Sequence, residues 1–424
     1  MNKTKDIYVT GFALFSMFFG AGNLILPPFL GKNAGNLWSW VTIGFFITAV
    51  FIPILGILAH AKLQGTLYDF GKKVSPIFST VYCLLIYTIS IALPAPRTAS
   101  VTHEMAIAPY FNSSSLITSS IYFSLVFVFV MNRTKVLNLL GKFLTPLIIL
   151  ILLSIIIIGM FSSPETMNLS TFKTPFISGL LEGYQTFDAI GAIVVGGILV
   201  ISINFNKETS FKAKKELITK AGFIAGLGLL IIYAGLIYNG ALFNSIFNQT
   251  ATRSEVLTAL STQTLGNIGT LFLSVLVSLA CFTTAVGIIT GTADYIKGIT
   301  NNLQETYIAT AIIGCVLGVL IGQLDVRNII NIALPVLMFI YPITIVLIIL
   351  NVISDKYTSA LVFKIVVAIT FVFSVPDFLE FFIDKEYLTK VKTVIPLANQ
   401  HLGWVLPATI SFILTNIIKI KKPA

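Results

Sequence analysis

The residues best suited to bind a ligand interrupt the first long apolar segment of the chain. The run Ser16-Met-Phe-Phe-Gly-Ala-Gly-Asn23 places helix-weakening glycines and an amide side chain between apolar stretches. If the segment spans a membrane, irregular backbone persists there only where it lines a protected cavity or holds a ligand. A helix broken at this point exposes amides that favour a carboxylate and carbonyls that favour a cation. The sequence therefore predicts a substrate site at Gly20, Ala21, Gly22 and Asn23.

A second polar run, Glu182-Gly-Tyr-Gln-Thr-Phe-Asp-Ala-Ile-Gly191, interrupts a later apolar segment. A carboxylate near the centre of a bilayer costs about 2.5 to 3.5 kcal/mol on insertion scales, and it points to a function. Asp188 could bind a substrate ammonium, ligate a cation or carry a proton. Tyr184, Thr186 and Phe187 are predicted to line the same substrate site. Glu182 lies nearer the end of the segment, where a structural ion pair or a gating contact is the simpler interpretation.

Arg97 is a third ionisable residue inside an apolar segment, and Pro94 and Pro96 loosen the helix just before it. A guanidinium at membrane depth needs a partner. The sequence offers three carboxylates for this ion pair: Asp188, Glu182 and Glu104. An ion pair or gating contact, an extension toward the outer surface, and direct contact with the substrate all remain open for Arg97.

Two adjacent hydroxyls, Thr283 and Thr284, follow Ala280-Cys-Phe282 in another apolar segment. Neighbouring helical positions point about 100° apart, so both oxygens can border one cleft and ligate a small hard cation. The alternative is structural, because threonines in membrane helices commonly bond back to the carbonyl of the preceding turn. Phe282, with Phe19 and Phe187, is predicted to supply the apolar wall that an aliphatic substrate requires.

The elements that position these residues are predicted to be membrane-spanning helices. Over 424 residues the chain is 56% hydrophobic and only 10% charged, with a mean hydropathy of +0.93. These values indicate an integral membrane protein. About twenty apolar residues cross a bilayer, and twelve such spans are predicted: Ile7–Leu30, Trp38–His60, Ile77–Thr102, Leu116–Met131, Leu144–Phe161, Phe176–Ile203, Ala221–Ala241, Asn267–Thr292, Tyr307–Leu324, Ile329–Ile353, Thr358–Val375 and His401–Ile418.

The charge pattern and the positions of the two interruptions predict orientation and symmetry. Most of the 27 Lys and Arg residues fall on one side of the spans when both termini are placed in the cytoplasm. The interruptions lie in the first and sixth spans, as expected for two inverted five-span repeats with broken first helices. We therefore expect a ten-span transport core over residues 1–353, with repeats at about 7–161 and 176–353. Residues 354–424 would add two helices and a short cytoplasmic tail.

Four motifs together resemble one known family, the bacterial branched-chain amino acid:cation symporters of the BrnQ family. They are Phe18-Phe-Gly-Ala-Gly-Asn-Leu-Ile25 with Pro27-Pro28, Pro96-Arg97-Thr98, Glu182-Gly-Tyr184 with Thr186 and Asp188, and Leu279-Ala-Cys-Phe-Thr-Thr284. The resemblance implies an all-α, LeuT-like fold of the amino acid, polyamine and organocation superfamily in a bacterial inner membrane. It also implies import of leucine, isoleucine and valine, driven by sodium or, in some members, by protons.

The same resemblance implies where a coupling ion binds. Its sodium ligands would be the backbone carbonyls of Ser16, Phe19 and Ala280 and the hydroxyls of Thr283 and Thr284. Asn23 and Thr186 match positions that hold a second sodium in some LeuT-like transporters. Many of those transporters lack a carboxylate at the position of Asp188. A second ion, a proton and the substrate ammonium therefore stay open as its partner.

Other function classes fit the sequence less well. The run His103-Glu104-Met-Ala-Ile107 lacks the second histidine of a zinc protease motif, and no nucleotide-binding or nucleophile motif appears. We therefore expect no enzyme and no cofactor. The basic residues lie in short loops rather than on one solvated face, so no nucleic acid is expected, and no obligate protein partner is evident. A channel would need a continuous polar path, whereas these polar groups gather at one depth.

Overall fold

The computed structural model describes residues 3–132, 136–162, 166–194, 196 and 211–421, and these residues form helices and connecting loops without a strand. The first five predicted spans correspond to the following elements: α1 (Lys3–Phe18) and α2 (Ala21–Ala34); α3 (Trp38–Phe46), η2 (Ile47–Phe51) and α4 (Ile52–Leu63); α6 (Pro76–Ala92), α7 (Pro94–Thr102) and η3 (His103–Ile107); α8 (Ser115–Asn132); and α9 (Val136–Phe161). Short helices η1 (Gly35–Leu37) and α5 (Leu67–Gly71) connect them.

The later spans follow in the same order. They are α10 (Pro175–Glu182), η4 (Gly183–Thr186) and helical residues 188–194; α12 (Phe211–Leu242); α13 (Arg253–Ile299); α14 (Gln304–Gly322); α15 (Val326–Val352); α16 (Ala360–Leu379); and α18 (Val405–Lys421). Short helices η5 (Asp355–Tyr357), α17 (Lys385–Val394) and η6 (Ala398–Gln400) lie between them. The end of the sixth span, residues 197–203, lies outside the described residues.

Eight described helical stretches are long and apolar enough to cross a membrane, and Pro146–Phe161 and Val405–Ile418 are shorter apolar helices. A helix that is broken halfway cannot reach the required length, so counting unbroken helices underestimates the spans. The element order is therefore consistent with twelve spans.

Both predicted interruptions are present in the backbone. Phe19 and Gly20 lie between α1 and α2 and belong to neither helix. Phe187 has a left-handed conformation with φ of 60° and separates η4 from helical residues 188–194. The Thr186 hydroxyl accepts a hydrogen bond from the Asp188 amide at 3.2 Å, which caps the second half-helix.

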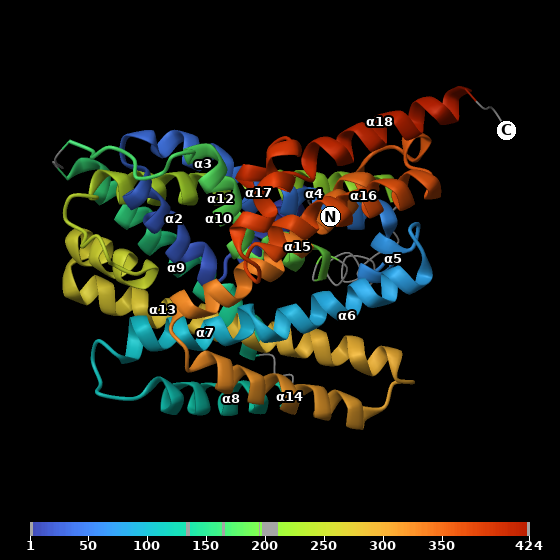
Figure 1. Cartoon of the computed structure of the whole chain (residues 1–424). Helices are drawn as coiled ribbons and strands as arrows, with labels where there is room; N and C mark the ends of the chain where they lie inside the picture. The colour runs from blue at the N-terminus through green and yellow to red at the C-terminus, as the bar shows by residue number, and fades with distance from the viewer. Residues whose placement is uncertain (1–2, 133–135, 163–165, 195, 197–210, 422–424) are drawn as a thin grey trace.

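Two groups of helices pack around these breaks. In the first group, α1 and α2 pack on α12, and α10 packs on α3. Glycines allow the close approach: a Cβ at Gly31 would lie 1.9 Å from the Ile237 carbonyl, and one at Gly44 would lie 2.0 Å from the Phe176 carbonyl. In the second group, α7, α8, α13 and α14 pack together and occupy the lower part of Figure 1. We call these the broken-helix bundle and the scaffold group.

The eighth span differs from its predicted limits. Gly266, with φ of 70°, divides α13 into an arm, Arg253–Leu265, and the membrane helix that follows. The arm begins at Thr252, whose hydroxyl and backbone amide form a capping box with Glu255. The sequence predicts the span from Asn267 onward and leaves this arm as loop. At the other end of the chain, α16 packs on α15 and α18 packs on α16.

Candidate functional site

The two broken helices meet at Asn23 and Asp188. The side-chain amide of Asn23, on α2, donates to a carboxylate oxygen of Asp188 at 2.6 Å and also donates to the hydroxyl of Tyr233 on α12. Asn23 is 1% exposed and Asp188 is 6% exposed. The structure thus brings together two predicted residues that are 165 positions apart. Tyr233 was not predicted, because an aromatic residue in an apolar helix carries no local signal of a polar contact.

Arg97 approaches the same breaks from α7. Its Nη1 donates to the backbone carbonyl of Gln185 at 2.7 Å, and its guanidinium lies 5.3 Å from the centre of the Phe187 ring. A Cβ at Gly22 would lie 2.5 Å from Arg97 Nη2, so a side chain at this position would displace the guanidinium from its place beside the first turn of α2. Arg97 is 4% exposed and forms no ion pair with any described residue.

The carboxylates expected to pair with Arg97 have other partners in the structure. Asp188 is bound by Asn23, as above. Glu182 accepts hydrogen bonds from Arg253 Nη2 at 2.7 Å and Nε at 2.9 Å. Glu104 accepts from the Val326 amide at 2.8 Å and from the Ser254 hydroxyl. The predicted ion pair of Arg97 with one of these three is therefore not found among the described residues.

Glu182 and Glu104 instead join helices on the side of the molecule that the charge distribution assigns to the outside, which we call the predicted outer side. Arg253 also lies over the Phe29 ring at 4.5 Å, so α2, α10 and the arm of α13 are held together there. Glu104 adds a link from η3 to the arm and to the start of α15. The Glu182 contact thus connects the broken-helix bundle to the scaffold group, as a gating contact requires, whereas Glu104 connects η3 to the arm and to α15.

Of the two adjacent threonines of α13, Thr284 faces the first break. Both donate to the Ala280 carbonyl at 2.9 Å, which is the structural hydrogen bond that threonines commonly form. Thr284 Oγ1 is nevertheless the nearest atom to a Cβ built on Gly20, at 3.9 Å. Hydroxyl and carbonyl oxygens from α13 therefore lie beside the backbone of the break, and oxygen ligands of this kind suit a small hard cation.

The aromatic residues of the predicted site have different surroundings. Phe19 stacks on Phe15 at 5.1 Å, and Tyr184 stacks on Tyr341 of α15 at 4.4 Å. The Tyr341 hydroxyl accepts from the Ala189 amide at 3.4 Å, so this unpredicted residue also holds the second half-helix.

Phe282 contacts two rings of α8, Tyr122 at 5.7 Å and Phe129 at 5.2 Å. It lies two positions before Thr284, or about 200° around the helix. These contacts do not support the expected place of Phe282 beside the substrate.

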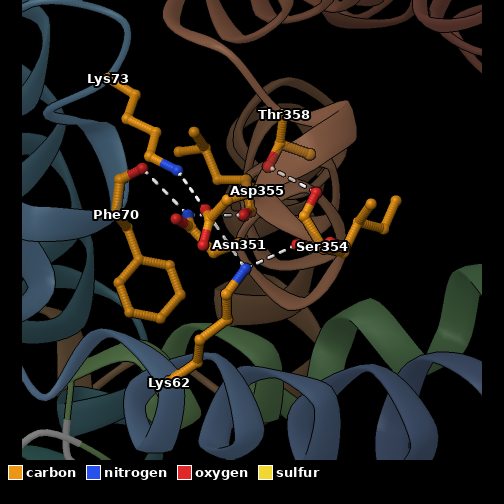
Figure 2. Close-up of polar contacts among 9 residues, drawn as sticks. Lys62, Phe70, Lys73, Asn351, Ser354, Asp355 and Thr358 are labelled. Carbon is orange, nitrogen blue, oxygen red and sulfur yellow. Dashed lines mark hydrogen bonds and ion pairs between the residues drawn. The ribbon is translucent and has the colours of Figure 1, made fainter.

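A further polar cluster lies where α4 ends, on the side assigned to the cytoplasm (Figure 2). Asp355 lies 2.8 Å from the Lys73 ammonium and 3.4 Å from that of Lys62, which also donates to the Ile353 carbonyl at 2.6 Å. The Lys73 hydrogen bond, with the charge of Lys62, lowers the pKa of Asp355 below its ordinary value. Asn351 donates to the Phe70 carbonyl beside it at 3.1 Å. This cluster joins α4 and α5 to the connection between α15 and α16.

Comparison with known proteins agrees with the fold and with the class of protein. Residues 3–422 match the family model described as branched-chain amino acid transport protein. The chain is 32% identical to the branched-chain amino acid permease BraB of Bacillus subtilis, over 98% of this chain and 96% of that one. It is also 32% identical to the branched-chain amino acid transport system 2 carrier protein of Pseudomonas aeruginosa, with the same coverage.

Solved structures of low sequence identity share the fold. The inward-facing conformation of Mhp1 matches with a TM-score of 0.60 and 11% identity, over 98% of this chain and 91% of that one. MhsT in complex with L-phenylalanine matches with a TM-score of 0.58 and 15% identity, over 96% of this chain and 97% of that one. The family match and the fold identify a transporter rather than an enzyme. The chain belongs to the branched-chain amino acid transport family and has the LeuT-like fold.

Proposed function

We propose that this protein is a secondary active symporter that imports leucine, isoleucine and valine together with sodium by alternating access. The observation that carries the proposal is the contact of Asn23 with Asp188, which joins the two broken helices at one buried place. A site formed by two half-helices can be reached from either side when the helices tilt. The family supplies the substrate class.

The substrate is a zwitterion, and the breaks offer groups for both of its ends. The amides of Ala21, Gly22 and Asn23 form the first turn of α2, where the helix dipole favours a carboxylate. The Asp188 carboxylate supplies the negative charge that an ammonium requires. Apolar contacts would select the side chain of the substrate, and one methylene changes the binding free energy by only about 1 to 3 kcal/mol. We therefore expect modest discrimination among the three branched-chain amino acids.

Sodium would bind between α13 and the first break. Its proposed ligands are the carbonyls of Ser16, Phe19 and Ala280 and the hydroxyls of Thr283 and Thr284. The 3.9 Å approach of Thr284 Oγ1 to the Cβ position of Gly20 supports this placement. An ion at this place would fix the backbone whose amides bind the substrate, and that shared dependence would couple the two binding events. Proton coupling through Asp188 is the second candidate, because this carboxylate is buried between the broken helices.

The contacts on the predicted outer side support a conformation that is closed toward the outside. Glu182 and Arg253 join α10 to the arm of α13, and Glu104 joins η3 to the same arm. On the opposite side α1 packs on α12, and its Val9 and Phe12 side chains are more than half exposed. We infer that outward opening separates Glu182 from Arg253, while the broken-helix bundle tilts against the scaffold group.

Uptake of radiolabelled leucine into proteoliposomes tests the proposal, with sodium and proton gradients imposed separately and protein-free liposomes as the control. We expect saturable uptake that an inward sodium gradient drives, and counterflow when unlabelled leucine is trapped inside. Uptake that follows only the proton gradient would establish the second candidate. Current that does not saturate with substrate would show a channel instead.

A further inference from the structure

Arg97 is a buried cation that forms no direct ion pair with a carboxylate among the described residues. Its guanidinium is 4% exposed, and among the described residues the acceptor of its Nη1 is a neutral carbonyl, that of Gln185. Its Nε is buried without a hydrogen-bond partner in this part of the chain. Burying a charge without a counter-charge is costly, so such groups persist where a ligand completes them. Asp188 acts on Arg97 through space, but its carboxylate is bound by Asn23, and no hydrogen bond joins it to the guanidinium.

The surroundings of Arg97 favour a negative group. Gly22 lies in the first turn of α2, so the guanidinium lies beside the end of the helix that carries the partial positive charge. The side-chain amide of Gln185 is also buried, 0% exposed, and neither of its polar atoms has a partner among the described residues. A cation and a helix N-terminus therefore meet at the backbone of Gln185, a residue whose side-chain amide is buried and unpartnered among the described residues.

We propose that Arg97 binds the carboxylate of the transported amino acid and that Gly22 sets the position of its guanidinium. The inference rests on the proposed function and assigns the two ends of the zwitterion to two side chains. Arg97 donates to the carbonyl of Gln185 in η4, and Asp188 lies three residues later, at the start of the second half-helix. Two opposite charges so close along the chain suit a molecule with adjacent carboxylate and ammonium groups.

The competing explanation is structural, because Arg97 also satisfies a carbonyl that the break in the sixth span leaves free. The two explanations differ in which ligands they affect. If Arg97 contacts the carboxylate, its replacement weakens the binding only of ligands that have a carboxylate. If its role is structural, its replacement weakens the binding of every ligand of the site. Leucine and its decarboxylated analogue, isoamylamine, separate the two cases because they share the side chain and the ammonium.

The experiment measures dissociation constants of leucine and isoamylamine for the purified full-length protein in saturating sodium, by calorimetry. For Arg97→Gln we expect leucine to bind at least about 30-fold more weakly, because one member of a buried charge pair is lost. The dissociation constant of isoamylamine should change less than about threefold. The conservative variant Arg97→Lys should keep part of the preference for leucine. An equal loss for both ligands in Arg97→Gln would overturn the assignment in favour of the structural role.

A second variant keeps the test decisive if Arg97→Gln does not fold. Gly22→Ala retains the arginine but places a Cβ 2.5 Å from Nη2. This substitution should weaken the binding of leucine more than the binding of isoamylamine. The matched control is Gly222→Ala on α12, where the nearest atom to the new Cβ is a methyl carbon at 3.4 Å, an ordinary contact. Equal effects of Gly22→Ala on both ligands would contradict the proposal.

The outcome for the unaltered protein separates this inference from the proposed function. If the protein binds a different amino acid, the substrate class is wrong. The effect of Arg97→Gln is then measured on the dissociation constants of that amino acid and of its decarboxylated amine. If it binds no amino acid, both proposals fail. Normal leucine binding with no selective effect at Arg97 removes the inference and leaves the proposed function intact.

Discussion

Threonines 283 and 284 have the same hydrogen bond to Ala280 but different positions relative to the first break. Thr284 Oγ1 is the atom nearest to the Cβ position of Gly20, whereas no such approach is seen for Thr283. A threonine hydroxyl that donates to a carbonyl keeps its oxygen lone pairs, and these can still ligate a cation. The backbone hydrogen bond thus orients each hydroxyl without excluding a second function.

We therefore expect Thr284→Ala to raise the sodium concentration for half-maximal leucine uptake by about tenfold or more, because one hard ligand is lost. Thr283→Ala should have a smaller effect of the same sign. Sodium titrations of initial uptake rates measure both. The control is Thr292→Ala, which removes an equivalent back-bonded hydroxyl two turns farther along α13. Unchanged sodium stimulation in the double variant of Thr283 and Thr284 would disprove this ion site.

Asp188 decides between the two modes of coupling. An amide at this position cannot carry a proton or a negative charge, although it can still bond with Asn23. We expect Asp188→Asn to reduce leucine uptake about 30-fold or more at every pH, because the ammonium loses its counter-charge. Rates measured across a pH series in proteoliposomes check this expectation. An unaltered rate and pH profile would exclude Asp188 from substrate binding and from proton coupling.

Among the elements, the arm of α13 has a role that its helix pattern does not suggest. Arg253 at its first turn binds Glu182 on α10, and both side chains are less than one fifth exposed. Partial burial and two hydrogen bonds make this pair stronger than an ordinary surface ion pair. The contact thus closes the predicted outer side over the broken helices.

Breaking this pair should favour the outward-open state. With Arg253→Gln we expect a cysteine introduced at Val326 to react roughly tenfold faster with a membrane-impermeant maleimide added from outside, since a charge-assisted pair contributes about 1.5 to 3 kcal/mol. The control is Glu305→Gln, which removes a carboxylate at the start of α14. Equal labelling rates in Arg253→Gln and the parent would show that the pair does not gate access.

The Asp355 cluster gives a stability prediction with a defined direction (Figure 2). The pKa of Asp355 in the folded protein is lowered from the ordinary 3.8, first by the Lys73 hydrogen bond. Its stabilising contribution is therefore complete above the unfolded pKa and disappears as pH falls through the folded pKa. The side chain is 68% exposed, so the effect is small.

We expect the melting temperature of the unaltered protein to exceed that of Asp355→Asn near neutral pH, and the difference to shrink as pH falls below 3.8, the ordinary pKa, and to vanish below the lower pKa of the folded protein. Thermal unfolding of the two proteins in detergent across this range measures the difference. Asp384→Asn, which removes an exposed aspartate after α16, serves as the control. A difference that grows on acidification would contradict the expected direction.

For the whole molecule, the sequence was sufficient to predict those features that have a local signal in a short stretch of residues. Glycines, Asn23 and Asp188 inside apolar runs predict the two breaks, and the four motifs that resemble the BrnQ family predict the LeuT-like fold. Contacts between distant segments had no such signal. Tyr233 and Tyr341 look like ordinary core residues, and the partner of Arg97 is a carbonyl freed by the break, which a search among carboxylates cannot find. The direction of a side chain also has no signal in the sequence, and Phe282 contacts Tyr122 of α8.

The arrangement of helices suggests which space must close during transport. α2 packs on α13 extensively, but α1 does not, and α1 packs on α12 instead. Gly291 lies seven residues after Thr284, on the same face of α13 and toward the predicted inner side. A Cβ built on Gly291 meets nothing within 4 Å. If the broken-helix bundle tilts as proposed, α1 must move into this space when the inner side closes.

Gly291→Trp should therefore fold but transport poorly. Because nothing lies within 4 Å of the Cβ position, we expect the present conformation to tolerate the indole and the closed inner side to exclude it. Leucine uptake should then fall at least about tenfold with little change in melting temperature. Val275→Trp is the matched control, because Val275 lies on the opposite face of α13 and is 46% exposed. Undiminished uptake in Gly291→Trp would mean that α1 does not close onto this part of α13, and the tilting mechanism would need a different inner gate.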